Sequence, residues 1–489
     1  MLSRLAKLRN HDANQAQSPL TLGRSGRIAL LIAGSIVCYQ IILPPPIGMA
    51  DNGDFAKIIG RFSLGAEVQN PDDRWYRYMH LRYTFSPVYH WDSGFHSSET
   101  LLLRAALVIN QVISKDGAFD IRCMGVVHAA LFLLAFGLAL PLLDGGPLIL
   151  RILLVALAIF IFCDVMYAAY YNSFAMDSAA YLFLLLTVVY GARALRGDPQ
   201  HPRDAWFAVI FCLLFLVAKS QHALFGLPLA AFAVWKRKSL WSQRARIFSI
   251  AAAGVIVLTA AFGLSQTTPP GYTAVPLFNV IFWGILPESQ HPKADLAQLG
   301  LDDSYLRHSG MTAYSPQSPM DSPPFAREFQ NRTSYERLGL FYARHPRIAL
   351  HFLRRGLEQG AQQRPYAGTF DLSAGYRPFF ASSAFSMWSA AKERCFHEHP
   401  WAYLLGFAGI VGYIASRSLA SGMALGTMGL TALGIGALCD AIDFTRHLFI
   451  FNAIWDISFF SAVCALTFRA RWSVSDASSG QRRDRRSVQ

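Results

Sequence analysis

Residues 122–143 read RCMGVVHAALFLLAFGLALPLL, and residues 147–170 read PLILRILLVALAIFIFCDVMYAAY. A helix needs about 20 mostly apolar residues to cross the hydrocarbon core of a bilayer, and each of these stretches is long enough. Two such runs in close succession predict a membrane protein with more than one transmembrane helix.

The rest of the chain has the same character. Its 489 residues are 53% hydrophobic and only 15% charged, with a mean hydropathy of +0.29, which is too apolar for a soluble protein of this size. Apolar runs of roughly span length lie at 28–45, 122–143, 147–170, 178–194, 204–220, 222–236, 246–265, 401–416, 420–440 and 447–468. The sequence therefore predicts an all-α, polytopic membrane helix bundle with about ten transmembrane helices.

The first apolar run has a second interpretation. Arg24 and Arg27 precede it and Gly48-Met49-Ala50 follows it, which is also the form of a cleaved secretory signal. Because further spans follow, we interpret this run as the first transmembrane helix.

The basic residues predict the orientation. The formal net charge is +13, but Lys and Arg collect in short clusters between apolar runs and form no single stripe, which argues against a nucleic-acid partner. With the N-terminus in the cytoplasm, almost every cluster falls on the cytoplasmic side, as the positive-inside rule requires. We expect a multi-pass membrane protein whose functional site lies on the non-cytoplasmic side.

This orientation divides the chain into five parts. They are a cytoplasmic N-terminal tail (1–27), a transmembrane module (28–265) that includes a first outer loop (46–121), a large second outer loop (266–400), the C-terminal transmembrane helices (401–468) and a basic cytoplasmic tail (469–489). Both outer segments are rich in aromatic residues, Pro and polar residues, so function is expected there or where they join the helices.

Helical spacing predicts short helices in these outer segments. One is a surface helix around 55–62, and two more lie within 335–362, broken at His345-Pro346. The stretch 98–113 is also helical in pattern. It fits either a second surface helix or an eleventh, re-entrant span.

Two carboxylates stand where the chain leaves the first predicted span. Residues 44–55 read PPPIGMADNGDF, which places Asp51 and Asp54 three residues apart. Asp51 fits a helix N-cap, and Asp54 fits the first helical turn. Alternatively, one of them accepts a proton from an incoming hydroxyl, or the pair holds a divalent cation. Both interpretations are compatible, because a capping Asp51 leaves Asp54 available.

Further charged residues lie at the outer ends of spans, where an unpaired charge is costly and is usually paired or functional. Asp164 and Asp177 flank a tyrosine-rich hairpin between the third and fourth spans, where the tyrosines also fit an interfacial aromatic belt and the acids a structural polar pair. The next outer turn contains Lys219, Gln221 and His222.

Arg446 and His447 open the last span. Like Lys219, they are cationic groups on the outer side, against the positive-inside bias. A lipid phosphate would attract such residues, because Lys offers a point charge and Arg a two-pronged donor. The competing explanation is snorkelling, or pairing with Asp440, Asp443 or Asp456.

A polar cluster precedes the 98–113 helix. Residues 90–99 read HWDSGFHSSE, which makes His96 and Glu99 candidates for substrate binding, although Ser97 or Ser98 as a cap and Glu99 as a first-turn acid explain the pattern equally well. The chain shows no Ser-His-Asp triad of known spacing, no phosphate-cradling Gly loop and no H-E-x-x-H zinc helix.

Together these motifs resemble the GT-C glycosyltransferases, which are polytopic enzymes that use polyprenyl-phosphate sugars, and among them the WsfD-type hexose transferases of bacterial surface-glycan synthesis. The resemblance covers roughly residues 28–468. It is carried by Met49–Phe55, Ser97–Glu99, Tyr171–Phe174, Asp177, Lys219–Gln221, Gly284–Pro287, Pro292–Leu296 and Arg446-His447. One departure is Asp177, where that family leads us to expect a glutamate.

The resemblance implies an inverting transfer of a hexose from a polyprenyl-phosphate-linked donor to a hydroxyl of a glycan, lipid or protein. Asp51 or Asp54 would be the general base. The donor phosphate would contact Lys219, His222, Arg446 and His447, and substrate contacts would come from Asn52, His96, Glu99, Asn172, Asp177 and Gln221. Phosphate leaves readily once its charge is neutralised, so no glycosyl-enzyme intermediate is expected. A divalent cation such as Mg²⁺ or Mn²⁺ is compatible with the acid pair.

Two other classes of membrane protein fit part of this pattern. A transporter or lipid flippase would also contain charges within its spans, but it favours inverted repeats and helices broken near the midplane over large outer loops with carboxylates. A membrane acyltransferase would carry its key histidine inside the bundle, whereas most histidines here lie in predicted loops.

Overall fold

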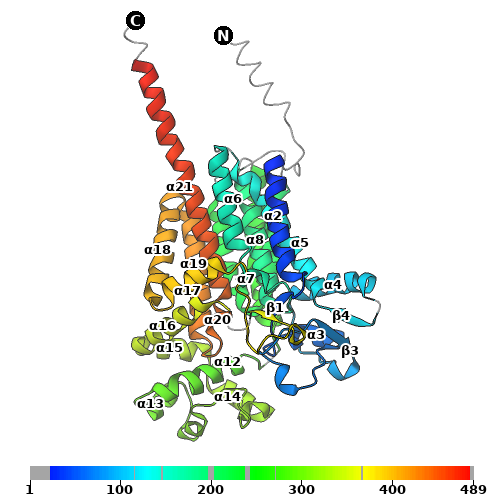
Figure 1. Ribbon diagram of the computed structural model, residues 1–489. Helices are drawn as coiled ribbons and strands as arrows, with labels where there is room; N and C mark the ends of the chain where they lie inside the picture. Colours follow the sequence, from blue (N-terminus) through cyan, green and yellow to red (C-terminus); the bar gives the residue numbers. More distant parts are fainter. Residues whose placement is uncertain are drawn as a thin grey trace.

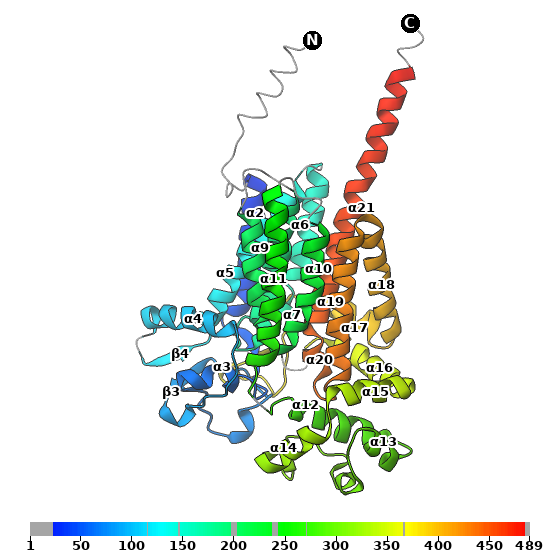
Figure 2. The same ribbon diagram turned by 180° about the vertical axis from the view of Figure 1, so that it is seen from behind.

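The computed structural model describes residues 23–114, 116–144, 147–196, 203–236, 243–269, 271–364 and 367–484. Long helices run side by side in a bundle, and shorter helices and strands gather at one of its ends (Figures 1 and 2). The bundle helices are α2 (Arg24–Ile41), α5 (Arg122–Ala139), α6 (Leu148–Phe162), α8 (Met176–Arg196), α9 (Asp204–Leu216), α10 (Gly226–Lys236), α11 (Gln243–Gln266), α18 (Pro400–Arg417), α19 (Leu419–Leu438) and α21 (Phe449–Asp484). The predicted all-α membrane bundle is confirmed.

Every predicted span overlaps one of these helices. Among the described residues, five segments are long and apolar enough to cross a membrane, namely Arg122–Leu143, Met176–Leu195, Arg246–Gln266, Leu419–Leu438 and Phe449–Thr467. The remaining bundle helices are shorter or less apolar. Most bundle helices bury one side against their neighbours and expose apolar side chains such as Leu258 and Leu405 on the other, as expected of a bundle surrounded by lipid, whereas α8 is central and exposes none of its described apolar side chains.

Some predicted boundaries are wrong. The run 147–170 is not one helix, because α6 ends at Phe162 and Asp164 caps a separate short helix, α7 (Val165–Ala168). The run 222–236 becomes helix α10 only from Gly226, after a 3-10 turn over Ser220–Phe225. Helix α21 continues to Asp484, well beyond the predicted end at 468. The rest of the C-terminal tail (485–489) and most of the N-terminal tail (1–22) lie outside the described residues.

The bundle has two distinct ends. The end from which the segments 46–121 and 266–400 emerge is here called the loop end, and the other end, where α2 begins and α21 finishes, the terminal end (Figure 1). Helices α8, α10 and α18 finish at the terminal end with Arg196, Lys236 and Arg417. The Lys236 ammonium donates to Ser418 there at 2.8 Å.

Helix α4 (Glu99–Ile113) lies across the bundle axis at the loop end in both views. It buries Leu103 and Ala106 on one face and exposes Val108, Val112 and Ile113 on the other. This geometry favours the surface helix over the eleventh span. The first predicted surface helix is α3 (Ala56–Ile59), extended by a 3-10 turn over Gly60–Phe62.

Two small antiparallel sheets support the loops at this end. Strand β1 (Ile47–Met49) pairs with β5 (Ala367–Phe370), and β3 (Arg82–Phe85) lies between β2 (Leu64–Gly65) and β4 (Ala118–Asp120). The β1–β5 pair joins the two outer segments and fixes the chain just ahead of the predicted acid motif.

The second outer segment forms its own small core at the loop end. It contains α12 (Ala274–Phe278), a π-helical turn (Asn279–Ile285), α13 (Pro292–Gln298), α14 (Pro323–Arg332), α15 (Tyr335–Arg344) and α16 (Pro346–Gln362). Buried aromatic side chains such as Phe278, Phe282 and Phe329 fill this core. The predicted helix break at His345-Pro346 is confirmed, since α15 ends at Arg344 and α16 begins at Pro346. The break forms because Pro disfavours the α conformation in the residue before it.

A buried polar network docks α17 (Met387–Phe396) onto the bundle. The Lys392 ammonium donates to Asp456 at 2.8 Å and to Asn452 at 3.0 Å, and both side chains of the Lys392–Asp456 pair are almost fully buried. Asp164 accepts the backbone N–H groups of Trp388 and Ser389, each at 3.0 Å. These two acids therefore have structural partners.

Asp164→Ala is expected to lower the free energy of unfolding by about 2 kcal/mol, because the carboxylate caps α7 and holds the start of α17, and one cap contributes about 1 kcal/mol. Thermal unfolding of the purified protein in detergent would measure the loss. Activity per folded molecule should not change. A variant with normal stability but altered activity would contradict this structural role.

Candidate active site

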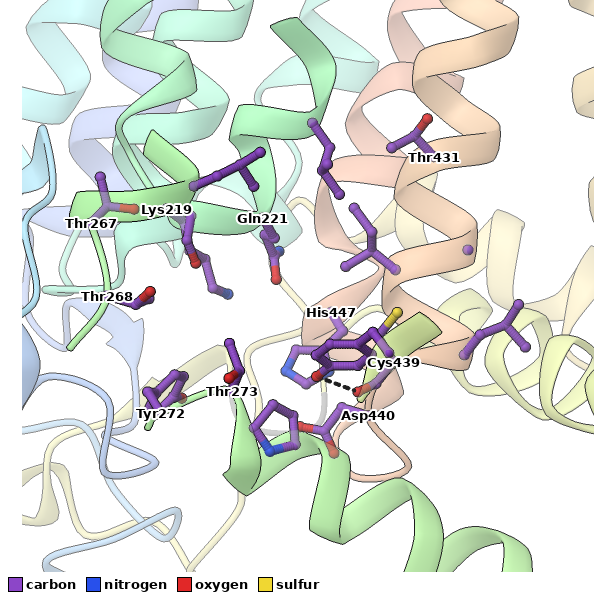
Figure 3. A pocket seen from close by; sticks show the side chains of 18 of the residues that line it. Lys219, Gln221, Thr267, Thr268, Tyr272, Thr273, Thr431, Cys439, Asp440 and His447 are labelled. Carbon is purple, nitrogen blue, oxygen red and sulfur yellow. Dashed lines mark hydrogen bonds between the residues drawn. The ribbon is translucent and has the colours of Figure 1, made fainter. Parts of the chain in front are cut away.

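A cavity of about 630 Å³ opens at the loop end of the bundle. Its walls come from the turn before α10, the end of α11, the segment that leads into α12, helix α15, the end of α19 and the short helix α20 (Phe444–His447). Its polar lining residues include Asp54, Lys57, Lys219, Gln221, Tyr272, Asp440, Arg446 and His447. In Figure 3, Lys219 and Gln221 extend from the α10 side toward His447 and Asp440.

Asp54 is the centre of the charged cluster. Its carboxylate accepts from the Lys57 ammonium and from the Arg446 guanidinium, and Arg446 Nε also donates to Asp443 at 2.8 Å. Burial alone would raise the pKa of Asp54, but Arg446 and Lys57 outweigh it and hold that pKa well below its usual value. Asp54 is therefore an ionised carboxylate, with 16% of its side chain exposed, in the wall of the cavity.

Asp51 has a different environment and does not line the cavity. Its Oδ1 accepts the backbone N–H of Gly53 at 2.7 Å and that of Phe55 at 3.3 Å, so it caps the turn that presents Asp54. Gly53 has φ +96°, a conformation that glycine adopts without strain. Burial raises the pKa of Asp51 to about 7, although the two N–H groups counteract the rise. The two acids of the motif are thus clearly distinct.

This raised pKa predicts a pH effect on stability. Folded Asp51 holds its proton up to about pH 7, while the unfolded residue loses it near the ordinary aspartate pKa of 3.8, so this group's contribution falls as pH rises between these values. Asp51→Asn removes the titration but keeps an oxygen for Gly53. Relative to the wild type, the variant's free energy of unfolding should gain on the order of 4 kcal/mol between about pH 4 and about pH 7. Melting temperatures of both proteins across this range test it, and parallel curves would contradict it.

Lys219 and Asp177 form a second ion pair beside this cluster. The Lys219 ammonium lies 3.3 Å from both carboxylate oxygens of Asp177, at the start of α8. Lys219 lines the cavity, whereas Asp177 lies behind it and is almost fully buried. The acid that replaces the expected glutamate thus holds a cavity cation in place.

Other predicted site residues lie outside the cavity wall. Asn52 contacts Asp443 at 3.5 Å, and His96 lies at the surface beside Arg61. Glu99 is buried 3.1 Å from His128, where it joins α4 to α5. None of these three side chains lines the cavity.

Asn172 and His222 are also buried behind the site. Asn172 donates to the backbone oxygens of Ile41 and Ile47 at 2.8 and 2.7 Å, so it ties the end of α2 to β1. A Cβ on Gly48 would approach the Asn172 backbone oxygen to 2.6 Å, which explains the glycine. His222 stacks on Phe215 within the bundle, with ring centroids 5.3 Å apart.

The sequence reasoning missed Lys57 and Tyr272. Lys57 follows Asp54 by one helical turn and donates to the Tyr272 hydroxyl at 2.6 Å. It also lies over the rings of Phe95 and Tyr272, at 5.0 and 4.6 Å from their centroids. The three-residue spacing between Asp54 and Lys57 is typical of an ion pair on one helix face and could have identified Lys57. Nothing in the sequence connects Tyr272 to the first loop. Asp440, considered only as an ion-pair partner, lines the cavity directly.

The donor set does not suit a divalent cation. The described residues contain no group of three or more His, Cys, Asp or Glu side chains that could hold a metal ion. Asp54, the ionised acid of the predicted pair, is already neutralised by Lys57 and Arg446. Mg²⁺ prefers anionic oxygen ligands, and two adjacent cations repel it.

Three comparisons relate the chain to known proteins. The crystal structure of the Archaeoglobus fulgidus oligosaccharyltransferase tethered with an acceptor peptide containing the NVT sequon aligns with 91% of this chain and 50% of that chain, at 12% identity and a TM-score of 0.39. The chain thus spans about half of that protein, and a likeness this low establishes neither fold nor activity. No curated protein matches the sequence. The family model of the YfdI N-terminal transmembrane domain matches residues 14–485, so the chain belongs to this family of membrane proteins.

Proposed function

We propose that the protein is a membrane glycosyltransferase of the GT-C type. It transfers a hexose, with inversion, from a polyprenyl-phosphate-linked donor to a hydroxyl group at the loop end of the bundle. Asp54 is the general base, and Lys219 and Arg446 hold the donor phosphate, with His447 beside them. Asp51 shapes the loop that presents Asp54.

The cavity described above is the observation that carries this proposal. One part of it is lined by Asp54, Lys57, Lys219 and Arg446, and another by apolar side chains of bundle helices, including Leu264 of α11 and Ile435 and Leu438 of α19. Leu224 and Leu264, at the edge of the apolar part, are 41% and 51% exposed on the side of the bundle. A ligand with a phosphate head and a long apolar chain matches both parts.

The charges suit the chemistry of an inverting displacement. Arg446 binds Asp54 and Asp443, so an incoming phosphate competes with Asp54 for the guanidinium. Phosphate binding thereby releases one Asp54 oxygen, which accepts the proton of the acceptor hydroxyl as the hydroxyl oxygen attacks the anomeric carbon. The sugar–phosphate bond breaks, and the negative charge of the leaving phosphate stays with Lys219 and Arg446.

The ends of the bundle support a periplasmic site. Helices α8, α10 and α18 finish with basic residues at the terminal end, and cytoplasmic loops are enriched in Lys and Arg. The loop end, with the cavity, then faces the periplasm of a bacterial inner membrane. The proposed acceptor is a glycan, lipid or protein that reaches this face.

The proposal is tested by transfer of a radiolabelled hexose. The purified chain in nanodiscs is given polyprenyl-phosphate hexose and the envelope fraction of the cells that carry it. We expect label to move into the acceptor with inverted anomeric configuration. Movement of the intact lipid between leaflets without loss of the sugar would favour a flippase and contradict the proposal.

Chelation gives a further prediction. Transfer should change less than about twofold in excess EDTA, because Lys57 and Arg446 already neutralise the carboxylate that a cation would need. The measurement is the initial rate before and after EDTA, with added Mg²⁺ or Mn²⁺ as the control. A large loss that either metal restores would overturn the assignment of phosphate binding to protein cations alone.

A further inference from the structure

A second cavity, of about 260 Å³, lies beside the outer end of α2, at the edge of the β1–β5 pair. It would hold roughly nine water molecules at about 30 Å³ each, which is space for one sugar ring. Tyr376 and Phe380 line it with rings stacked 4.7 Å apart at an interplanar angle of 4°. Phe370 packs against Tyr376 at 4.4 Å.

None of the described residues that line this cavity carries a charge. Its polar side-chain groups are the amide of Gln40 and the hydroxyls of Tyr39, Tyr376, Ser382 and Ser383. Gln40 is almost fully buried, and its Oε1 has no hydrogen-bond partner in the part of the chain that the structure describes. An aromatic wall with neutral polar groups suits a neutral, hydroxylated ring and disfavours phosphate or carboxylate ligands.

Backbone strain is concentrated in the same region. Tyr76, Phe379 and Phe385 have φ values of +64°, +62° and +52°, which large side chains rarely adopt. All three side chains are exposed, by 45%, 55% and 42%. Strain of this kind persists at sites where the surrounding structure holds a side chain for a purpose.

These aromatic residues connect the second cavity to the candidate active site. The Phe379 N–H donates to the Arg77 backbone oxygen at 3.0 Å. One residue earlier, the Tyr76 hydroxyl donates to the backbone oxygen of Asn52, two residues from Asp54. On the other side, strand β1 runs from the second cavity directly to Asp51.

We propose that this aromatic cavity is a second saccharide-binding site, which holds a neutral sugar unit of the acceptor at a distance from the hydroxyl that reacts at Asp54. The inference rests on the proposed function, and it adds a site outside the catalytic cavity. A sugar ring would stack its apolar face on Tyr376, and Tyr76 and Phe379 would guide the chain toward Asn52. The alternative role for these rings is to anchor the loops in the membrane interface.

The substitution Tyr376→Leu separates the two roles, because leucine keeps the apolar character and removes the flat ring. Ser383→Trp fills the cavity from an exposed position and serves as a second variant. Trp283→Leu is the matched control, since Trp283 is 47% exposed in the π-helical turn and lines neither cavity. The probe is a neutral oligosaccharide fraction released by mild acid from the surface polysaccharide of cells that carry the protein.

Binding is measured by saturation-transfer NMR on the full chain in nanodiscs, and kinetics by the transfer assay. We expect both cavity variants to raise the dissociation constant and the acceptor KM about fivefold to tenfold, with unchanged hydrolysis of donor alone and no effect in the control. Unchanged binding by Tyr376→Leu would assign the rings to membrane anchoring, and absence of binding by the wild type would also overturn the site. Oligosaccharide binding without any sugar transfer would contradict the proposed function and leave this site standing. Sugar transfer with an unaltered acceptor KM in both variants would contradict this site and leave the proposed function standing.

Discussion

Asp54→Asn is expected to reduce kcat for hexose transfer by about 10²- to 10⁴-fold, the usual contribution of a general base. The amide cannot accept the proton of the acceptor hydroxyl, although it occupies the same volume in the cavity wall. The rate is measured with donor and acceptor at saturation, so that weaker binding does not contribute. Donor binding should survive, because Lys57, Lys219 and Arg446 remain.

Asp443→Asn is the matched control for this experiment. Asp443 also binds Arg446, and its side chain is 15% exposed, against 16% for Asp54, but it does not line the cavity. Both variants thus remove one carboxylate partner of Arg446, but only Asp54→Asn also removes the proposed general base. We expect Asp443→Asn to retain transfer within about tenfold of the wild type. Equal losses in the two variants would mean that Asp54 only positions Arg446.

Arg446→Gln is expected to lower kcat/KM for the donor by about 10²- to 10³-fold. Removal of one partner from a buried, hydrogen-bonded charge pair costs about 2–5 kcal/mol, and each 1.4 kcal/mol is tenfold. The guanidinium pairs with Asp54 and Asp443. In the proposed mechanism it also neutralises the donor phosphate. The measurement is a titration with donor at saturating acceptor. Most of the loss should appear in the donor KM.

Two further variants serve as a partial rescue and a control for the Arg446→Gln measurement. Arg446→Lys restores the charge without the two-pronged geometry, so it should recover only part of the activity. Arg332→Gln removes an exposed arginine that pairs with Asp302 and Glu328, and it should not change the donor KM. A donor KM in Arg446→Gln equal to that of the wild type would mean that the phosphate binds elsewhere.

Much of the fold could be predicted from the sequence, because the bilayer imposes a simple length and composition rule on helices. The rule failed where local polar chemistry overrides apolarity. Asp164 ends one helix and starts another within a single apolar run, and the turn at Ser220–Phe225 delays α10. These two failures occur at the loop end, where polar partners from other segments are available, whereas the early end predicted for α21 is an error at the terminal end.

The candidate site could be predicted only in part. Asp54, Lys219 and Arg446 were recognisable because charged residues at the outer ends of spans need partners or ligands. Their common cavity depends on segments hundreds of residues apart, such as Asp54 with Arg446 and Lys57 with Tyr272. Sequence spacing carries no information about such contacts. For the same reason Glu99 looked like a substrate ligand, whereas it is fully buried against His128.

The most direct test of the central claim is a cryo-EM structure of the protein in nanodiscs with polyprenyl-phosphate hexose. We predict that the phosphate lies between Lys219 and Arg446, that the prenyl chain follows the apolar wall formed by Leu264, Ile435 and Leu438, and that the anomeric carbon faces Asp54. A lipid phosphate bound at the terminal end, or a sugar turned away from Asp54 in a fully occupied cavity, would contradict the account.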